Sequence, residues 1–424
     1  MRNLIYKIMN ASGARIYSVL LGIITLSITA RWLGPEGRGI IATVITWVEI
    51  FIEVTALSLG QVLIFKATLN RDEGWLASIM GVLFKHTLIV SLISWAIVVT
   101  LYIGGQYWGW PRIFGDTPAI ALLIGFIGLP FGLWDIYSKS LLNIEDQFST
   151  YNKYQIFGST ANTFSIIFLV LVSGFGILGV LVSKVFWQFI VAFGGIKKLL
   201  DNTTSKISYR FDTYKDLLKN GIKMHIGTIG AIMTLNVDIV MVNAYLGNEQ
   251  TGIYQLAVQM SQLMLLVSYA ATTVLEGELT RKGIHGIWPY QKRILALTLI
   301  FIVCASLIMG FTAKWWLIWL AGLEFQGAII IFQLLLITIV VNTITAVMSV
   351  QWIGRGWFLQ NSAITLVKGV MNIGLNALLI PSYGILGAVY ATIAVITLSL
   401  FINIGMFIYC ELDNRKYKKQ LEMS

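Results

Sequence analysis

Three acidic residues inside apolar stretches are the side chains of this sequence best suited to chemistry. Glu49 and Glu53 are one helical turn apart, and Asp238 lies in a different apolar stretch. Two glutamates at this spacing repel each other when both are ionised, so one of them can hold a proton near neutral pH. We therefore expect Glu49, Glu53 and Asp238 to be candidates for coupling to Na+ or H+. The alternative is structural, with the glutamates paired to Arg15 or a lysine and Asp238 packed against polar neighbours.

Basic and amide side chains in similar stretches could bind a ligand. Arg15 and Lys368 are surrounded by apolar sequence, where a cationic group is a suitable partner for an anionic headgroup. Amides at helical spacing could bind polar parts of the same ligand. The candidate amides are Gln255, Gln259, Gln262 and Asn372. Alternatively, Arg15 extends to the membrane interface, and the amides join neighbouring helices.

The sequence contains no arrangement of residues that is typical of an enzyme. His86, His225 and His285 are far apart and lack the spacing of metal ligands. No phosphate-binding loop ending in Gly-Lys-Ser or Gly-Lys-Thr occurs in the sequence. We therefore expect no catalytic residue, no metal site and no cofactor apart from a coupling ion.

The elements that carry these residues are expected to be transmembrane helices. Hydrophobic residues make up 57% of the 424 residues and charged residues only 12%, and the mean hydropathy is +0.78. Charged residues are about a quarter of an ordinary soluble domain. Apolar stretches of roughly 20 residues, each able to cross about 30 Å of hydrocarbon as a helix, predict an all-α polytopic membrane protein. The twelve predicted spans are 11–33, 38–65, 80–104, 118–142, 153–174, 176–196, 221–246, 251–278, 293–313, 325–352, 358–380 and 384–410.

Basic residues are distributed unevenly between the connections. With a cytoplasmic N-terminus, and with basic residues towards the end of a span counted with the side they are nearer to, 23 of the 30 lysines and arginines fall on the inner side, 4 on the outer side and 3 within spans. The positive-inside rule therefore predicts that both termini are cytoplasmic. The net charge of +10 is then a sign of membrane orientation and not of nucleic-acid binding.

Two short motifs recur at an offset of about half the chain. The segment LGPEGRGI at 33–40 is echoed by LGNEQTGI at 246–253, and GILGV at 176–180 is echoed by GILGA at 384–388. Because six spans separate the copies, the halves are predicted to be parallel repeats about an axis along the membrane normal. The predicted parts are an N-terminal six-helix bundle at 1–200, a basic cytoplasmic linker at 201–219, a C-terminal six-helix bundle at 220–410 and a cytoplasmic tail at 411–424.

Polar residues of the two halves correspond to each other at this offset. Glu49 corresponds to Gln262, and Thr25 corresponds to Asp238. Polar side chains are costly to expose to lipid, so matching polar faces predict a central cavity between the bundles.

Three segments carry a resemblance to a known family: 30–39, 238–254 and 372–388. The last contains an Asn-rich span end followed by Pro, an aromatic residue, Gly and a Gly-Ala helix start. On these segments the chain resembles the polysaccharide biosynthesis flippases, of the Wzx type, within the multidrug/oligosaccharidyl-lipid/polysaccharide exporter superfamily. Asp238 matches an acidic residue that is frequent in the seventh span of that family. The extra pair of spans found in the lipid II branch is missing from the twelve predicted here.

The resemblance implies a function. Such proteins have a V-shaped central cavity and move undecaprenyl-diphosphate-linked oligosaccharide, such as an O-antigen unit for lipopolysaccharide, across the bacterial cytoplasmic (inner) membrane. Arg15 and Lys368 would then hold the diphosphate, the amides would contact sugars, and an acidic residue would couple the step to an ion gradient. Expected partners are the lipid-linked glycan, membrane lipid, a glycan polymerase and a chain-length regulator, with the chain itself a monomer.

Three other functions are compatible with parts of this pattern. A multidrug/cation antiporter of the same superfamily would use Asp238 and the glutamates to bind cationic amphiphiles. A membrane-embedded glycan polymerase would need a large outer loop rich in Arg and His, which the sequence lacks. A membrane scaffold without transport is the third.

Overall fold

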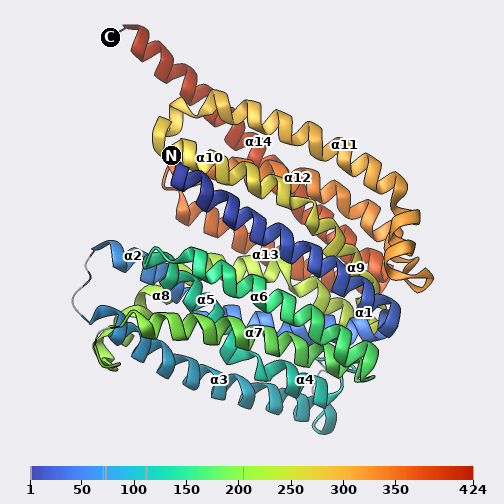
Figure 1. The fold of residues 1–424 in the computed structure, drawn as a ribbon. Coiled ribbons are helices and arrows are strands. Elements are labelled where there is room, and N and C mark those ends of the chain that lie inside the picture. Colours follow the sequence, from blue (N-terminus) through green and yellow to red (C-terminus); the bar gives the residue numbers. More distant parts are fainter. Residues whose placement is uncertain (1, 70, 72–73, 110–112, 204, 424) are drawn as a thin grey trace. The chain divides into compact units, whose positions relative to one another are not determined.

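All regular secondary structure in the computed structural model is helical among its described residues (Figure 1), which are 2–69, 71, 74–109, 113–203 and 205–423, with side chains described for 13 and for those from 16 to 420. The expected all-α class is confirmed. The elements in chain order are α1 (Arg2–Ala56), α2 (Leu59–Leu69), α3 (Trp75–Tyr107), α4 (Ala119–Ile127), α5 (Leu129–Ile144), α6 (Phe148–Ile166), the π-helical η1 (Ile167–Val172), α7 (Gly176–Asp201), α8 (Phe211–Leu235), α9 (Val237–Leu263), α10 (Leu265–Gly286), α11 (Trp288–Ala321), the 3-10 turn η2 (Leu323–Phe325), α12 (Ala328–Gly354), α13 (Phe358–Tyr383) and α14 (Ile385–Met423).

The chain is a multi-pass membrane protein. Ten helical stretches of the described chain are long and apolar enough to cross a membrane. Two of them, Ile16–Leu69 with 54 residues and Phe211–Gly286 with 76 residues, far exceed the roughly 20 residues that one crossing needs. Each of these two stretches is long enough to contain more than one crossing.

Both long stretches contain a sharp turn at a glycine. Gly34 has φ 64° and ψ −174°, and Gly247 has φ 80° and ψ −176°, within otherwise helical backbone. Backbone with these φ and ψ angles is found almost only at glycine. The two glycines occupy the same place in the repeated motif, so the motif has the same backbone turn in both copies.

The two copies of the motif also pack reciprocally. A Cβ atom on Gly39 would overlap the carbonyl oxygen of Asn248, and one on Gly252 would overlap the carbonyl oxygen of Pro35. The offset of 213 maps Gly39 onto Gly252 and Pro35 onto Asn248. Each copy therefore needs glycine at this position, because the backbone of the other copy leaves no room for a Cβ atom.

The chain divides into two compact units. Unit 1 contains residues 1–232 and 243–252, and unit 2 contains residues 233–242 and 253–424. Helix α8 begins at Phe211, so the second half of the predicted linker 201–219 is helical.

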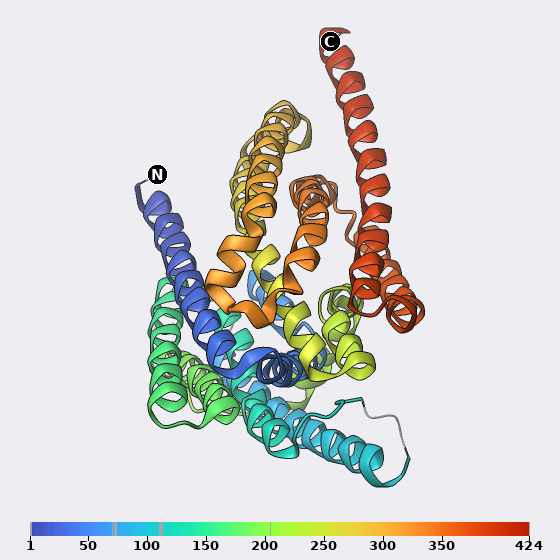
Figure 2. The same ribbon diagram turned by 90° about the vertical axis from the view of Figure 1, so that its right-hand side faces the viewer.

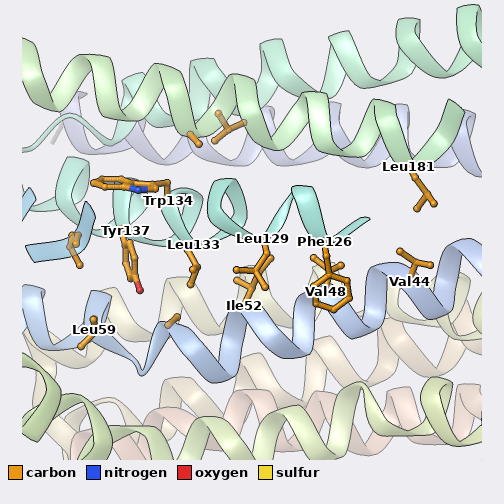
Figure 3. Close-up of a cluster of buried hydrophobic side chains, with 14 of the residues drawn as sticks. Val44, Val48, Ile52, Leu59, Phe126, Leu129, Leu133, Trp134, Tyr137 and Leu181 are labelled. Atoms are coloured by element: carbon orange, nitrogen blue, oxygen red, sulfur yellow. The ribbon is translucent and has the colours of Figure 1, made fainter. Parts of the chain in front are cut away.

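The core of unit 1 is built where α1 packs against α4 and α5. Val44, Val48 and Ile52 recur every four residues on one face of α1 and meet apolar residues such as Phe126 and Leu129 (Figure 3). Glycines make this approach possible, because a Cβ at either of two positions on the facing helices would overlap a side chain of α1. These positions are Gly125 and Gly132.

Unit 2 contains the long helix α14, which is drawn in red in Figure 2. Near its C-terminal end, Glu411 accepts hydrogen bonds from Lys292 Nζ at 2.7 Å and Trp288 Nε1 at 3.0 Å. Asp413 accepts from Arg355 Nη2 at 2.8 Å. These contacts attach the end of α14 to α11 and α12.

Candidate functional site

A buried carboxylate in unit 2 is surrounded by hydrogen-bond donors. Asp238, in the first turn of α9, is 6% exposed. Its Oδ1 accepts from Asn372 Nδ2 at 2.6 Å and from Asn376 Nδ2 at 2.7 Å. Its Oδ2 accepts from the Tyr254 hydroxyl at 3.1 Å and from Thr392 Oγ1 at 3.0 Å. The carboxylate thus joins α9, α13 and α14.

The glycine turn in α9 positions Tyr254 against the carboxylate. Asp238 and Tyr254 are 16 residues apart, which in a straight helix would separate them by about 24 Å. Their hydrogen bond is made because the chain reverses at Gly247. On α13, Asn372 and Asn376 are four residues apart and therefore lie on one face.

The charge of Asp238 is not neutralised by a neighbouring base. No Lys, Arg or His nitrogen of the described side chains lies within 4 Å of its carboxylate. The Oδ1 atoms of Asn372 and Asn376 are buried and have no hydrogen-bond partner within the described part of the protein. A buried carboxylate next to unpaired amide oxygens is suited to binding a proton or a hard cation, because such cations prefer oxygen ligands.

Clusters of metal-ligating side chains are absent from the described residues. Among the described residues there is no group of three or more His, Cys, Asp or Glu side chains that could hold a metal ion.

Lys368 lies one turn before Asn372 on the same face of α13. Its Nζ donates to Ser399 Oγ of α14 at 3.4 Å, and no described carboxylate oxygen lies within 4 Å of it. The structure thus places a cationic group, an amide and a carboxylate along one side of α13. The side chain of Arg15, the other predicted anion ligand, is outside the described residues.

The predicted glutamines lie on the second arm of α9, beyond Gly247. Gln255 Nε2 donates to Gln259 Oε1 at 3.0 Å, and Gln262 is exposed. They share this arm with Tyr254, but no hydrogen bond between them and the Asp238 carboxylate is present in the described structure.

The two glutamates of α1 have different surroundings within unit 1. Glu49 Oε1 lies 3.8 Å from Lys184 Nζ, which is the structural pairing considered as the alternative. Glu53 has no hydrogen-bond or ion-pair partner among the described residues and lines a cavity of about 470 Å³ together with Lys139.

Three members of the Asp238 cluster, Tyr254, Asn376 and Thr392, are not among the site residues predicted from sequence. Threonine is common in apolar spans, and Thr392 is 154 residues from Asp238 along the chain. The one signal for Tyr254 was its place directly after the Gly-Ile end of the repeated motif.

Comparison with known proteins identifies the family. A family model described as "Polysaccharide biosynthesis protein" matches residues 5–275, which is more than half of the chain. A search of curated proteins gives no match.

The fold is similar to that of several solved transporters. The lipid II flippase MurJ in an inward closed conformation has a TM-score of 0.75 at 14% identity, over 95% of this chain and 90% of that chain. An inward-facing multidrug resistance MATE family transporter of the MOP superfamily has a TM-score of 0.69 at 15% identity, over 95% of this chain and 96% of that one. A MOP superfamily transporter from Pyrococcus furiosus has a TM-score of 0.58 at 14% identity, over 97% of this chain and 94% of that one.

At these identities the similarity shows the fold alone, which the chain shares with solved transporters of the MOP superfamily. The matched family model adds the family, and the chain belongs to the polysaccharide biosynthesis protein family.

Proposed function

We propose that the chain is a flippase that moves an undecaprenyl-diphosphate-linked oligosaccharide, such as an O-antigen repeat unit, from the inner to the outer leaflet of a bacterial cytoplasmic membrane. The observation that carries this proposal is the family match over residues 5–275 on a transporter fold. Each unpaired polar group costs several kcal/mol in hydrocarbon, so a diphosphate and its sugars need a sheltered route. The prenyl chain can remain in lipid throughout.

The proposed architecture has twelve crossings in two parallel repeats. In this architecture the glycine turns at Gly34 and Gly247 divide each of the two longest helical stretches into two crossings. The other eight stretches cross once each, which gives twelve crossings in total. The reciprocal packing of the two motif copies supports a duplication. Both termini are then cytoplasmic, and transport proceeds by alternating access between the two halves.

Lys368 is the proposed partner of the diphosphate within unit 2. Its ammonium group has no carboxylate within 4 Å among the described residues, so its charge is available to an anionic ligand. Arg15 is the proposed second anion ligand, and Gln255, Gln259, Gln262 and Asn372 are proposed sugar contacts.

Asp238 is the proposed site of ion coupling. A bound H+ or Na+ would neutralise the carboxylate and could draw the unpaired amide oxygens of Asn372 and Asn376 towards it. Loss of the ion restores the charge and the four hydrogen bonds, so occupancy changes the contacts among α9, α13 and α14. Glu49 is already paired with Lys184, which makes Asp238 the stronger coupling candidate of the two.

A multidrug/cation antiporter is the second candidate, since the MATE transporters share the fold. Deletion of the gene distinguishes the flippase from the antiporter. The flippase predicts loss of surface glycan, accumulation of its lipid-linked precursor and unchanged drug resistance. The antiporter predicts increased sensitivity to cationic amphiphiles with normal glycan, and that result would overturn the proposal. Re-expression of Lys368→Ala at equal protein amount is expected to restore export poorly, whereas Lys368→Arg restores more because it keeps the charge.

A further inference from the structure

Unit 1 contains a polar cavity that is separate from the Asp238 cluster. Its volume is about 470 Å³, and residues of α1, α2, α5, α6 and α8 line it. Pockets that bind small organic ligands commonly have about 300–1,000 Å³. The cavity is therefore large enough for a small ligand.

Four polar side chains line this cavity without a hydrogen bond or a close ion pair to another described side chain. They are Glu53 of α1, Gln61 of α2, and Lys139 and Asn143 of α5. None of them makes a side-chain hydrogen bond or ion pair with the described part of the chain. Lys139 and Asn143 are four residues apart and so lie on the same face of α5. Gln61, Lys139 and Asn143 are exposed and Glu53 is half-buried, so two opposite charges and two amides are accessible to a ligand in the cavity.

A break between α1 and α2 brings these groups together. Leu57 and Ser58 have φ values of 49° and 53°, which are costly for residues with a Cβ atom. The break is held by Ser58 Oγ, which lies 3.1 Å from His225 Nδ1 and 3.0 Å from Thr228 Oγ1 of α8. These contacts with α8 therefore stabilise the turn that directs α2 towards the cavity.

A glycine fixes the distance between α2 and α5. A Cβ atom on Gly60 would overlap the hydroxyl of Ser140, so the two helices are in close contact at this point. Gln61 follows Gly60 directly, and Lys139 precedes Ser140. Both Gln61 of α2 and Lys139 of α5 line the cavity at this contact.

The charges of the lining decide the class of ligand. A phosphate would be repelled by Glu53 and a cation by Lys139, so neither kind of ion suits the cavity as a whole. A polyhydroxyl ligand can donate to the carboxylate, accept from the ammonium group and do both with the amides. Ile136 and Phe148 add apolar surface, against which the C–H face of a sugar ring can pack.

From this combination we infer that the cavity of unit 1 is a saccharide-binding site, which holds a mono- or disaccharide portion of the transported glycan through Glu53, Gln61, Lys139 and Asn143. The inference rests on the proposed function and adds a sugar-selective site in the N-terminal half. In the proposed orientation this end of unit 1 is cytoplasmic, where the glycan is loaded.

The first test is export in a strain that lacks the chromosomal gene. Glu53→Gln, Lys139→Gln and Asn143→Ala are compared with Lys153→Gln and Asn220→Ala, which change the same residue types outside the cavity. Each cavity variant is expected to lower export of the complete repeat unit by about tenfold at equal protein amount, as the loss of a charged or amide contact predicts. Export in a strain that makes a lipid carrying only the first sugar should change less.

The two proposals fail in different ways. If deletion of the gene leaves glycan export normal, the proposed function is wrong. If deletion abolishes export but the cavity variants behave like Lys153→Gln, the flippase stands and the saccharide site is overturned.

A labelling experiment avoids dependence on the activity of the variants. Ile64→Cys, at a position that lines the cavity but is not one of the four proposed contacts, is introduced together with Cys304→Ala, because Cys304 is exposed while Cys410 is buried. The probe is the oligosaccharide released by mild acid from the lipid-linked glycans of the same cell. It is expected to slow maleimide labelling of position 64 about threefold or more at concentrations above its Kd. Equal labelling rates with and without saturating glycan would rule the site out.

Discussion

The carboxylate of Asp238 is held by neutral donors rather than by a cationic side chain. Buried charges are usually paired with an opposite charge or bind a metal. Among the described residues, the side chains that donate to Asp238 are amides and hydroxyls. One of these donors, the hydroxyl of Thr392, also lies 2.9 Å from the carbonyl oxygen of Ala388. Its hydroxyl can therefore turn to that carbonyl and present an oxygen lone pair to an incoming cation.

Replacing Asp238 by Asn should test this role. The amide has nearly the same size but no charge, so it cannot take up H+ or Na+ in the same way. We expect glycan export to fall about tenfold or more, consistent with loss of a charged contact. Export at equal protein amount is the measurement, with Asp212→Asn, an exposed acid on α8, as the control. Normal export by Asp238→Asn would show that coupling occurs elsewhere.

Sequence alone could identify only part of this cluster. Asp238 and Asn372 are conspicuous because polar groups are rare within apolar spans. Thr392 is not conspicuous, because its hydroxyl can bond to the carbonyl four residues earlier in any helix. Its contact with Asp238 depends on how α14 packs in unit 2, and no local pattern encodes that packing.

The ends of helices can be predicted from the sequence where a glycine lies at the end. The segments containing Gly34 and Gly247 were both predicted to be turns between spans, and both have the same non-helical conformation. The break at Leu57 and Ser58 was not predicted, since neither glycine nor proline marks it. Contacts from α8 impose this break, so it belongs to tertiary structure.

Close packing of the motif copies predicts an unusual response to alanine. In a helix interior, Gly→Ala ordinarily stabilises by about 0.5–1 kcal/mol. At Gly39 and Gly252 the added Cβ would meet a backbone carbonyl oxygen, and overpacking of this kind costs about 1–3 kcal/mol. We expect Gly39→Ala and Gly252→Ala to lower the Tm of the purified protein in detergent, and Gly22→Ala, which has free space around it, to leave the Tm unchanged or raise it. A higher Tm for Gly39→Ala would contradict the reciprocal packing.

At the scale of the whole molecule, the proposed twelve crossings fix which ends of helices face the same side. An even number of crossings places both termini on one side, and the excess of basic residues assigns that side to the cytoplasm. The composition and the length of apolar stretches were sufficient to predict a polytopic helical protein. They do not define the two compact units, between which the chain passes near the end of α8 and twice within α9.

Cysteine accessibility in intact cells tests this orientation. In a Cys304→Ala background, Tyr107→Cys at the end of α3 should react with a membrane-impermeant maleimide from outside. Lys153→Cys on α6 should react only after the membrane is permeabilised. Both positions are exposed, so burial does not explain a difference between them. The reverse result would invert the topology.

The attachment of α14 has a practical consequence for making shortened or fused forms of the protein. The side chain of Arg355 is only 6% exposed, and Asp413 is its carboxylate partner. Cutting the chain after Cys410 would remove that partner together with Glu411, and would leave Gln351 as the remaining hydrogen-bond partner of the Arg355 guanidinium, so we expect the shortened protein to have a lower Tm. Affinity tags and fluorescent reporters therefore belong beyond the last turn of this helix.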